Sequence, residues 1–128
     1  MSAEFVHLRL HTEFSLIDSV VRVPELVDAV RAAGMPAVAV TDQSNLFAMV
    51  KFYRAALAKG VKPVIGVDLF VKELGERATH SKVTLLCQSQ AGYRNVTRLV
   101  SRAYLEGQQR GTPTIDRDWL TLDRKSVV

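Results

Sequence analysis

Arg9 and His11 are two polar residues near the N-terminus whose spacing could place them in one site. Apolar residues at Val6, Leu8 and Leu10 alternate with them, which is typical of a β-strand. Because successive strand side chains point to opposite faces, Arg9 and His11 are expected on the same face, about 7 Å apart. Such a pair, with acidic residues nearby, could bind a metal ion or a phosphate group. For this segment alone, a half-buried strand with a solvated polar face is the alternative.

Further polar candidates follow the next apolar runs. Asp42–Gln43 comes directly after the run 37–41, and Asp68 lies near the end of the predicted strand 63–71. Continuous apolar runs of this kind are typical of strands buried in a parallel sheet. Asp18 lies in the loop after the first strand. Since the chemistry of such folds gathers at the C-terminal ends of the strands, we expect these residues to lie near Arg9 and His11.

Helices are predicted between these strands. One begins at Val23–Pro24 and ends near Gly34, and a third covers residues 91–106 with a buried face of Val96, Leu99, Val100 and Ala103. Residues 74–81 are predicted to form a loop before a fourth strand at 83–87. The order strand, helix, strand, helix, strand, strand, helix predicts an α/β fold with mainly parallel strands.

The second helix is predicted to begin with Ser44 or Asn45 as its cap and to end at Gly60. Its buried face is expected to carry four apolar residues at intervals of three and four, namely Leu46, Val50, Tyr53 and Leu57.

A stripe of arginines, Arg94, Arg98 and Arg102, is expected on the exposed side of the third helix. It could contact a phosphate backbone or an acidic partner. The more common explanation of such a stripe is a solvated helix face.

The composition bounds the class of protein. The 128 residues are 48% hydrophobic and 23% charged, which is ordinary for one soluble globular domain or a part of one. The net charge of +4 permits contact with nucleic acid but does not require it, because the basic residues are spread along the chain. No apolar run approaches the length of a membrane span, and no signal peptide is visible. The single Cys87 fits a buried residue in a reducing compartment, so we expect a cytoplasmic protein.

Four segments, 7–18, 39–47, 60–68 and 91–95, resemble the motifs of the PHP (polymerase and histidinol phosphatase) domain family. The form they resemble most stands at the N-terminus of the alpha subunits of bacterial replicative DNA polymerases. The resemblance covers essentially residues 4–120, and four motifs in the right order make it specific. Residues 1–120 are therefore expected to be a partial PHP domain. Residues 121–128 do not resemble the continuation, so we expect a truncated or misread end of a longer chain.

The resemblance implies a fold and a chemistry. PHP domains are distorted TIM-like barrels of seven βα units, of which this chain would form the N-terminal portion. Active members hold several metal ions, such as Zn²⁺ or Mn²⁺, and use them for phosphatase or exonuclease chemistry. In the polymerases the domain precedes the polymerase proper, a nucleotidyltransferase that uses Mg²⁺. The resemblance thus implies DNA replication as the process, with catalysis of polymerisation outside this segment.

Three of the implied metal-ligand positions keep a residue type that binds metals. His11 and Asp18 match the family's first motif, and Asp68 stands where the family has Glu. The remaining ligands of the family would lie beyond Val128.

Three other ligand positions are substituted. Arg9, Gln43 and Lys82 each stand where the family has His; His80 could replace Lys82 only with a shift of register. Arginine is always protonated and offers no lone pair to a metal. We therefore predict that Arg9 and Lys82 pair with Asp18 and Asp68, and that this segment binds no metal cofactor.

The resemblance leaves more than one function open. The first is a catalytically decayed scaffold that holds the separate proofreading 3′-5′ exonuclease subunit, next to other replicase subunits and, through the parent chain, DNA; Arg94, Arg98 and Arg102 are the possible partner face. The alternative is an active metal-dependent phosphoesterase or 3′-5′ exonuclease. A free-standing phosphatase of small molecules is a third possibility, which the polymerase-like motifs disfavour.

Overall fold

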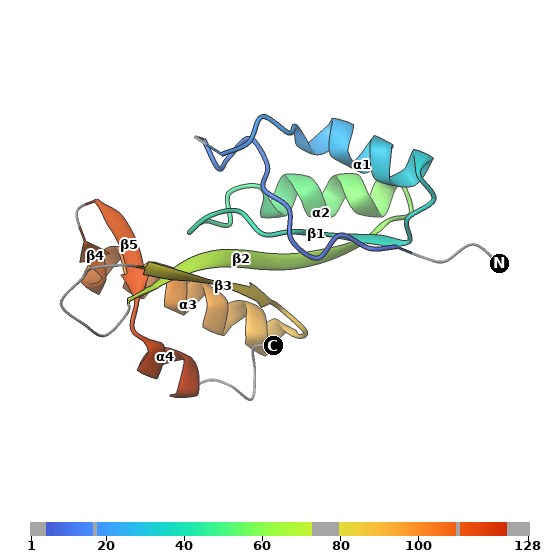
Figure 1. Ribbon diagram of the computed structural model, residues 1–128. Coiled ribbons are helices and arrows are strands. Elements are labelled where there is room, and N and C mark those ends of the chain that lie inside the picture. Colours follow the sequence, from blue (N-terminus) through green and yellow to red (C-terminus); the bar gives the residue numbers. More distant parts are fainter. Residues whose placement is uncertain (1–4, 17, 73–79, 110, 123–128) are drawn as a thin grey trace.

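The computed structural model of the chain describes residues 5–16, 18–72, 80–109 and 111–122. Strands and helices largely alternate along it, as the apolar runs predict (Figure 1). The elements in chain order are α1 (Val23–Ala32), β1 (Ala37–Val40), α2 (Met49–Ala58), β2 (Lys62–Lys72), β3 (His80–Leu86), α3 (Gln90–Glu106), β4 (Gln108–Gln109), β5 (Thr112–Ile115) and α4 (Arg117–Leu122).

The sheet is built around β2, its longest strand. β1 pairs with the first half of β2 in parallel, and β5 pairs in parallel near its end. β3 pairs antiparallel with β2 from Gly66 to Lys72, and the short β4 pairs antiparallel with β5. The predicted fourth strand is thus found, although β3 begins at His80, inside the predicted loop; residues 73–79 lie outside the described part. The α/β prediction is confirmed.

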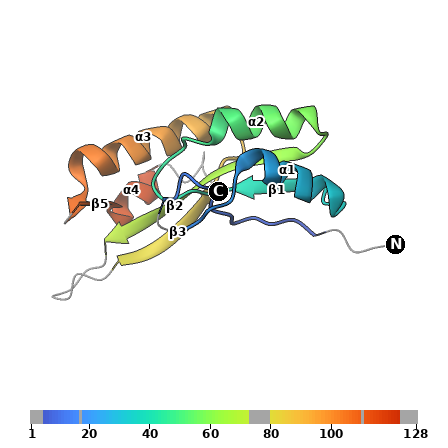
Figure 2. The same cartoon turned by 90° about the horizontal axis from the view of Figure 1, so that it is seen from above.

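The helices α2 and α3 cover the same face of β2 and follow one another along it (Figure 2). Ile65 packs into a core cluster built from α1, β1 and α2, whereas Val67, Leu69 and Val71 pack with α3 and β5 in a second cluster. These four residues share one parity, so they point to one side of the strand. The opposite side of β2, which includes Asp68, is left for the polar residues described below.

The N-terminal segment differs from the predicted strand. Residues 5–12 run beside β1, but they do not form a regular strand. The amide groups of Ala39 and Thr41 donate to the carbonyl oxygens of His7 and Leu10, each at 2.8 Å. The acceptors are three residues apart and the donors only two, so the segment carries one extra residue, as in a β-bulge. The alternation is lost there, and Leu8 is 53% exposed instead of buried.

The start of the second helix was predicted incorrectly. α2 begins at Met49, and Ala48, at its cap, makes no side-chain capping bond among the described residues. Ser44 and Asn45 are not caps because the chain continues along β2 after β1 has ended. The Ser44 amide donates to the carbonyl oxygen of Asp68 at 2.8 Å, and Ser44 then turns with a φ of 54°. Ser44 is thus still hydrogen-bonded to β2, and the Asn45 side chain donates to the Phe14 carbonyl oxygen and accepts from the Phe47 amide, so the helix begins only at Met49.

The buried face of α2 also differs from the prediction. Phe52 and Ala56 point into the core, whereas the predicted Val50, Tyr53 and Leu57 are exposed. The helix therefore carries two apolar stripes, and the sheet covers only one of them. Periodicity alone does not distinguish two such stripes.

The first and third helices agree with the prediction. α1 ends just before Gly34, which adopts the left-handed conformation (φ 75°) common after a helix end. α3 begins after Ser89, whose side chain accepts a hydrogen bond of 3.1 Å from the Gly92 amide. Cys87 is half-buried, and this burial raises the pKa of its thiol. Within the described part of the chain, no helix is both long and apolar enough to cross a membrane.

Candidate functional site

Asp68 is the centre of a polar cluster on the side of β2 that faces away from α2 and α3. It is only 1% exposed. The Nε atom of Arg9 donates to Oδ2 of Asp68 at 2.8 Å, and Nε2 of His11 lies 2.5 Å from the same oxygen. Thr84, the direct cross-strand neighbour on β3, donates its hydroxyl to Oδ1 at 2.5 Å. Both oxygens of this buried carboxylate therefore have partners.

His11 connects two carboxylates. Its Nδ1 atom is hydrogen-bonded to Asp18, and its Nε2 atom to Asp68. Burial of the ring lowers the pKa of His11, but the hydrogen bonds and the negative charges of both aspartates outweigh this and raise it above its usual value. The hydrogen bond from His11, followed by the charges of His11, Lys82 and Arg9, lowers the pKa of Asp18 despite some desolvation. The arrangement thus favours an imidazolium between two carboxylate anions.

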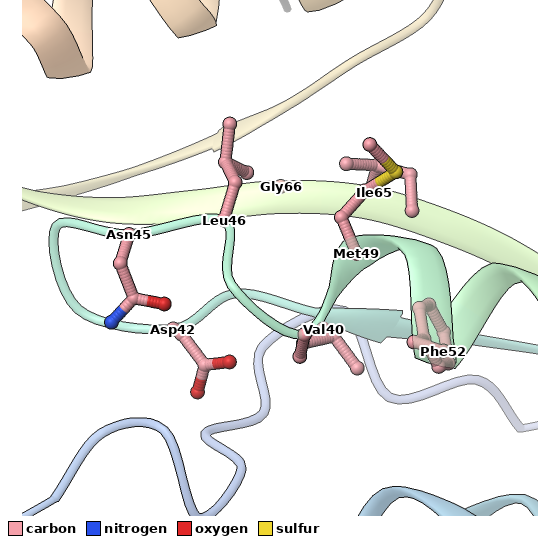
Figure 3. A pocket seen from close by; sticks show the side chains of 9 residues that line it. Val40, Asp42, Asn45, Leu46, Met49, Phe52, Ile65 and Gly66 are labelled. Carbon is pink, nitrogen blue, oxygen red and sulfur yellow. The ribbon is translucent and has the colours of Figure 1, made fainter.

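Asp42 fixes the loop that carries His11 and Asp18. It is 1% exposed and accepts three hydrogen bonds: 2.6 Å from the Thr12 amide, 2.7 Å from the Thr12 hydroxyl and 2.8 Å from the Ser15 hydroxyl. Figure 3 shows its carboxylate pointing away from β2, toward the N-terminal segment. The sequence located Asp42 at a strand end, but no local pattern indicated its role as an anchor, because its partners are 27 to 30 residues away.

Two of the substituted ligand positions border the cluster. The backbone of Gln43 forms an isolated parallel β-bridge with Asp68 of β2. The backbone amide of Gln43 donates to the Ser15 hydroxyl at 3.1 Å. Lys82 lies on β3, with its ammonium group 5.3 Å from the centre of the Phe70 ring, and it acts on Asp18 through its charge. The side chain of His80 lies outside the described part of the structure.

The Arg94–Arg98–Arg102 stripe lies on α3, away from this cluster. All three side chains are exposed. Arg102 is bound to Glu106 at 2.6 Å, and its guanidinium stacks on the Trp119 ring at 3.9 Å. The structure therefore does not bring these arginines into the site around Asp68.

A metal cluster of the kind implied by the resemblance does not fit these residues. A metal-binding His must offer a lone pair, but both ring nitrogens of His11 are engaged by carboxylates. Arg9 places a guanidinium where a cation would sit beside Asp68. Among the described residues, no three or more His, Cys, Asp or Glu side chains are grouped so as to hold a metal ion. The cluster can nevertheless join the N-terminal segment to β2 by charge-assisted hydrogen bonds.

Comparison with known proteins finds one matching domain family and, among the relatives, DNA polymerase III alpha subunits. The PHP domain family matches residues 7–128. The chain is 52% identical to the DNA polymerase III subunit alpha of Pseudomonas aeruginosa over 120 residues, covering 94% of this chain and 10% of that protein. It is 46% identical to the corresponding subunit of Escherichia coli over 118 residues, covering 91% of this chain and again 10% of the relative. The chain thus spans about a tenth of the length of these relatives.

Comparison with solved structures confirms the fold. An amidohydrolase from Chromobacterium violaceum, with sulfate bound and no metal, matches 77% of this chain and 32% of its own, with a TM-score of 0.61 and 19% identity. A protein from Bifidobacterium adolescentis, provisionally named a metal-dependent phosphoesterase, matches 81% of this chain and 34% of its own, with a TM-score of 0.63 and 16% identity. The chain therefore shares the α/β fold of a part of these two larger structures.

Proposed function

The chain belongs to the PHP domain family, whose pattern matches residues 7–128, and from this premise we propose that it is the N-terminal PHP segment of a bacterial DNA polymerase III alpha subunit. Identities of 46% to 52% with such subunits, over at least 91% of this chain, support the proposal. The parent chain is then a DNA-directed DNA polymerase of the cytoplasm. It adds nucleotides to a primer in a separate polymerase domain that uses Mg²⁺.

Within that parent, the segment is a catalytically decayed scaffold. The observation that carries this proposal is the contact of Arg9 and His11 with one buried carboxylate, Asp68. Two cationic side chains neutralise the charge that a metal ion would otherwise neutralise. Neither leaves a lone pair for a metal, because guanidinium has none and the imidazolium form of His11 carries a proton on each nitrogen. The former ligands are then used to hold the fold together.

The scaffold has a second part in this proposal, which is to hold the proofreading 3′-5′ exonuclease subunit. A docked exonuclease stays close to the polymerase site, so its effective concentration at a mispaired primer end is raised without any new catalytic residue. The exposed arginines Arg94, Arg98 and Arg102 are the proposed partner face, with Arg94 and Arg98 as its main contributors because Arg102 is bound within the chain. Other replicase subunits and DNA are reached through the parent chain.

An active metal-dependent phosphoesterase or 3′-5′ exonuclease is the second candidate. One observation favours it: His11 contacts both of the other ligand-type residues, Asp18 through Nδ1 and Asp68 through Nε2. Arg9 and Lys82 oppose it by their charge, and Gln43 replaces a stronger ligand.

Two measurements on the complete alpha subunit that carries this sequence distinguish the decayed scaffold from the active enzyme. They are the amount of metal that the subunit binds and its hydrolytic activity. The subunit is stripped of metal and then supplied with Zn²⁺ or Mn²⁺. Bound metal is measured by mass spectrometry, and hydrolysis is measured on p-nitrophenyl phosphate and on 3′-labelled single-stranded DNA. We expect neither stoichiometric Zn²⁺ nor hydrolysis above that of the Asp68→Ala variant. Stoichiometric metal, with activity lost in Asp18→Ala or Asp68→Ala, would establish the active enzyme instead.

The docking role is tested separately, by co-elution of the purified exonuclease and alpha subunits. Arg94→Glu with Arg98→Glu is expected to reduce co-elution, whereas Arg22→Glu and Arg31→Glu, on the N-terminal side of the chain, serve as matched charge controls. Unchanged co-elution of the Arg94 and Arg98 variant would place the contact elsewhere.

A further inference from the structure

A hollow lies between the turn that precedes α2 and the C-terminal half of α3. Its volume is about 570 Å³, and pockets that bind small ligands have roughly 300–1,000 Å³. Two of its lining residues, Leu46 and Val100, are half-buried and pack against the core cluster of β2, α3 and β5. In Figure 3 the Leu46 side chain points to the opposite side of its segment from Asp42. The hollow is therefore separate from the polar cluster around Asp68.

Two exposed aromatic side chains line this hollow, one from each of the elements beside it. Phe47 is 72% exposed and Tyr104 is 43% exposed. Asn45 fixes the turn that carries Phe47, because its side chain donates to the Phe14 carbonyl oxygen and accepts from the Phe47 amide. An exposed aromatic ring on a fixed turn offers a flat apolar surface on which another ring can stack.

Ser44 adds a hydrogen-bonding group to the lining. The residue is only 5% exposed, and its Oγ atom has no hydrogen-bond partner among the described residues. A buried hydroxyl without a partner costs free energy. Ser44 also has a φ of 54°, which residues other than glycine rarely adopt and which is frequent at ligand sites. The hollow thus contains a donor and acceptor that the described part of the fold leaves unused.

The lining of the hollow is uncharged, whereas the helices next to it are basic. None of the nine lining residues carries a charge. α2 contains Lys51 and Arg54 and no acidic residue. α3 contains three arginines, and its one acidic residue, Glu106, is bound to Arg102. The hollow therefore suits an uncharged ring, while its surroundings attract negative charge. A nucleic acid combines these properties, because its neutral bases are attached to a chain of phosphates.

We propose that this hollow binds an unpaired base of single-stranded DNA. The base would stack on Phe47 and contact Tyr104, and its edge would bond the Ser44 hydroxyl, which a rotation about χ1 can turn toward it. Proteins that bind single strands use this combination of aromatic stacking with positive charge around the backbone. An aliphatic side chain of a protein partner fits less well, since it would leave the Ser44 hydroxyl unpaired. Bases in a duplex are already stacked and paired, so they do not enter.

The base site goes beyond the proposed function, because neither the decayed scaffold nor the docking of the exonuclease requires it. Only the choice of DNA over RNA rests on the proposed parent polymerase. The first test below needs this chain alone. A failure to bind a base would therefore leave the assignment of the parent as it is, and a different parent would leave the base site standing.

The test measures binding of a fluorescein-labelled thymidine strand of about 12 nucleotides to this chain by fluorescence anisotropy. An abasic strand of the same length carries the same phosphates without bases and is the control ligand. We expect the thymidine strand to bind at least about tenfold more tightly, which is the effect of one stacked base. Higher salt should weaken both strands and preserve their ratio, because salt screens the phosphates but not the stacking.

Matched variants locate the base. Phe47→Ala and Tyr104→Ala should each weaken the thymidine strand, Phe47→Ala by about tenfold, and leave the abasic strand unchanged. Phe5→Ala removes an aromatic ring that is 59% exposed but does not line the hollow, and it should change neither strand. Circular dichroism confirms that each variant is folded.

Ser44→Ala separates a binding role of the hydroxyl from a structural one. It should weaken the thymidine strand about threefold, the effect of one hydrogen bond. It should not lower the thermal midpoint of unfolding, because the hydroxyl has no partner to lose among the described residues. A lower midpoint with unchanged affinity would show that the hydroxyl serves the fold and not a ligand.

A second measurement uses the complete alpha subunit, so it does not depend on how this chain folds by itself. A strand that contains 5-iododeoxyuridine is irradiated in the presence of the subunit, and crosslinked peptides are identified by mass spectrometry. We expect the peptide with Phe47 or the peptide with Tyr104 among them.

Three outcomes would overturn the proposal. The first is equal affinity of this chain for the thymidine strand and the abasic strand. The second is crosslinking of the complete subunit at neither Phe47 nor Tyr104. The third is displacement of the thymidine strand by N-acetyltryptophanamide at concentrations at which free thymidine displaces none, which would assign the hollow to an aromatic side chain of a protein.

Discussion

The Nε atom of Arg9 lies 2.8 Å from Oδ2 of Asp68, although 59 positions separate the two residues in the chain. Arg9 is half exposed, whereas the Asp68 carboxylate is buried in the sheet. A buried carboxylate must be paired or hydrogen-bonded, because desolvation disfavours its charge. This contact therefore joins the extended N-terminal segment to β2, at the position where the resemblance implies a metal.

Replacing Asp68 with Asn should destabilise the chain clearly. Arg9 and His11 would lose the charge that holds them, and we expect the free energy of unfolding to fall by about 2 kcal/mol. The control is Asp28→Asn, which removes an ion pair of 3.5 Å with Lys59 between two exposed side chains. It should cost less than about 0.5 kcal/mol. Urea unfolding followed by circular dichroism measures both, and equal losses would contradict the central role of Asp68.

Restoring histidines at the substituted positions should restore metal binding. In an Arg9→His, Gln43→His and Lys82→His variant, two fixed positive charges disappear and three lone-pair donors return. We expect this variant to bind Zn²⁺ in calorimetric titration and the natural chain to bind none specifically. A variant with histidines at Arg22, Gln88 and Lys59, outside the cluster, controls for added histidines. Equal Zn²⁺ affinity of the natural chain and the restored variant would contradict the proposed decay.

The stability of the chain should depend on the His11–Asp18 pair. The folded pKa of His11 is raised above the usual 6.5, so its contribution is full below pH 6.5 and is lost as the pH rises through the folded value. The folded pKa of Asp18 is lowered below the usual 3.8, so its contribution is present above pH 3.8 and is lost as the pH falls through the folded value. The pair thus stabilises the chain most between these limits.

Thermal midpoints of unfolding, measured from about pH 3 to about pH 9, test this. The range is chosen to extend below the usual pKa of an aspartate and above that of a histidine. His11→Gln and Asp18→Asn should each flatten the profile, and the double variant should add little, because both remove the same interaction. His7→Gln, whose ring packs edge-on against Phe5 at 4.7 Å, is the matched histidine control. A profile that stays unchanged in His11→Gln would show that this pair does not govern the pH dependence.

Asp42 should be as sensitive to substitution as the candidate site itself. Asp42→Ala removes an acceptor of three hydrogen bonds and leaves the buried Thr12 hydroxyl and amide without it, so a loss of about 3 kcal/mol is expected. Ser15→Ala removes only one of the three bonds and should cost about 1 kcal/mol. Chemical denaturation gives both values. Equal losses for the two variants would mean that Asp42 does not anchor the loop.

Residue types and local periodicity were sufficient for much of the fold. The apolar runs at 37–41 and 63–71 are the cores of β1 and β2, and the end signals at Pro24 and Gly34 match the two ends of α1. These features follow from local chemistry: buried strands require continuous apolar residues, and helix ends require particular backbone conformations. The substitution of potential ligands by Arg9, Gln43 and Lys82 is likewise a matter of residue type.

Other features depend on contacts between distant segments. The bulge near Leu8 arises because the N-terminal segment must match the spacing of β1. α2 begins only at Met49 because Gln43 and Ser44 are still paired with β2. Its outer apolar stripe is exposed because only Phe52 and Ala56 point into the core. His11 lies between Asp18 and Asp68, and Asp42 anchors residues 12–15, only because parallel pairing brings separate strand ends together. Periodicity describes one element at a time, so long-range hydrogen bonds and the choice between two apolar faces lie beyond it.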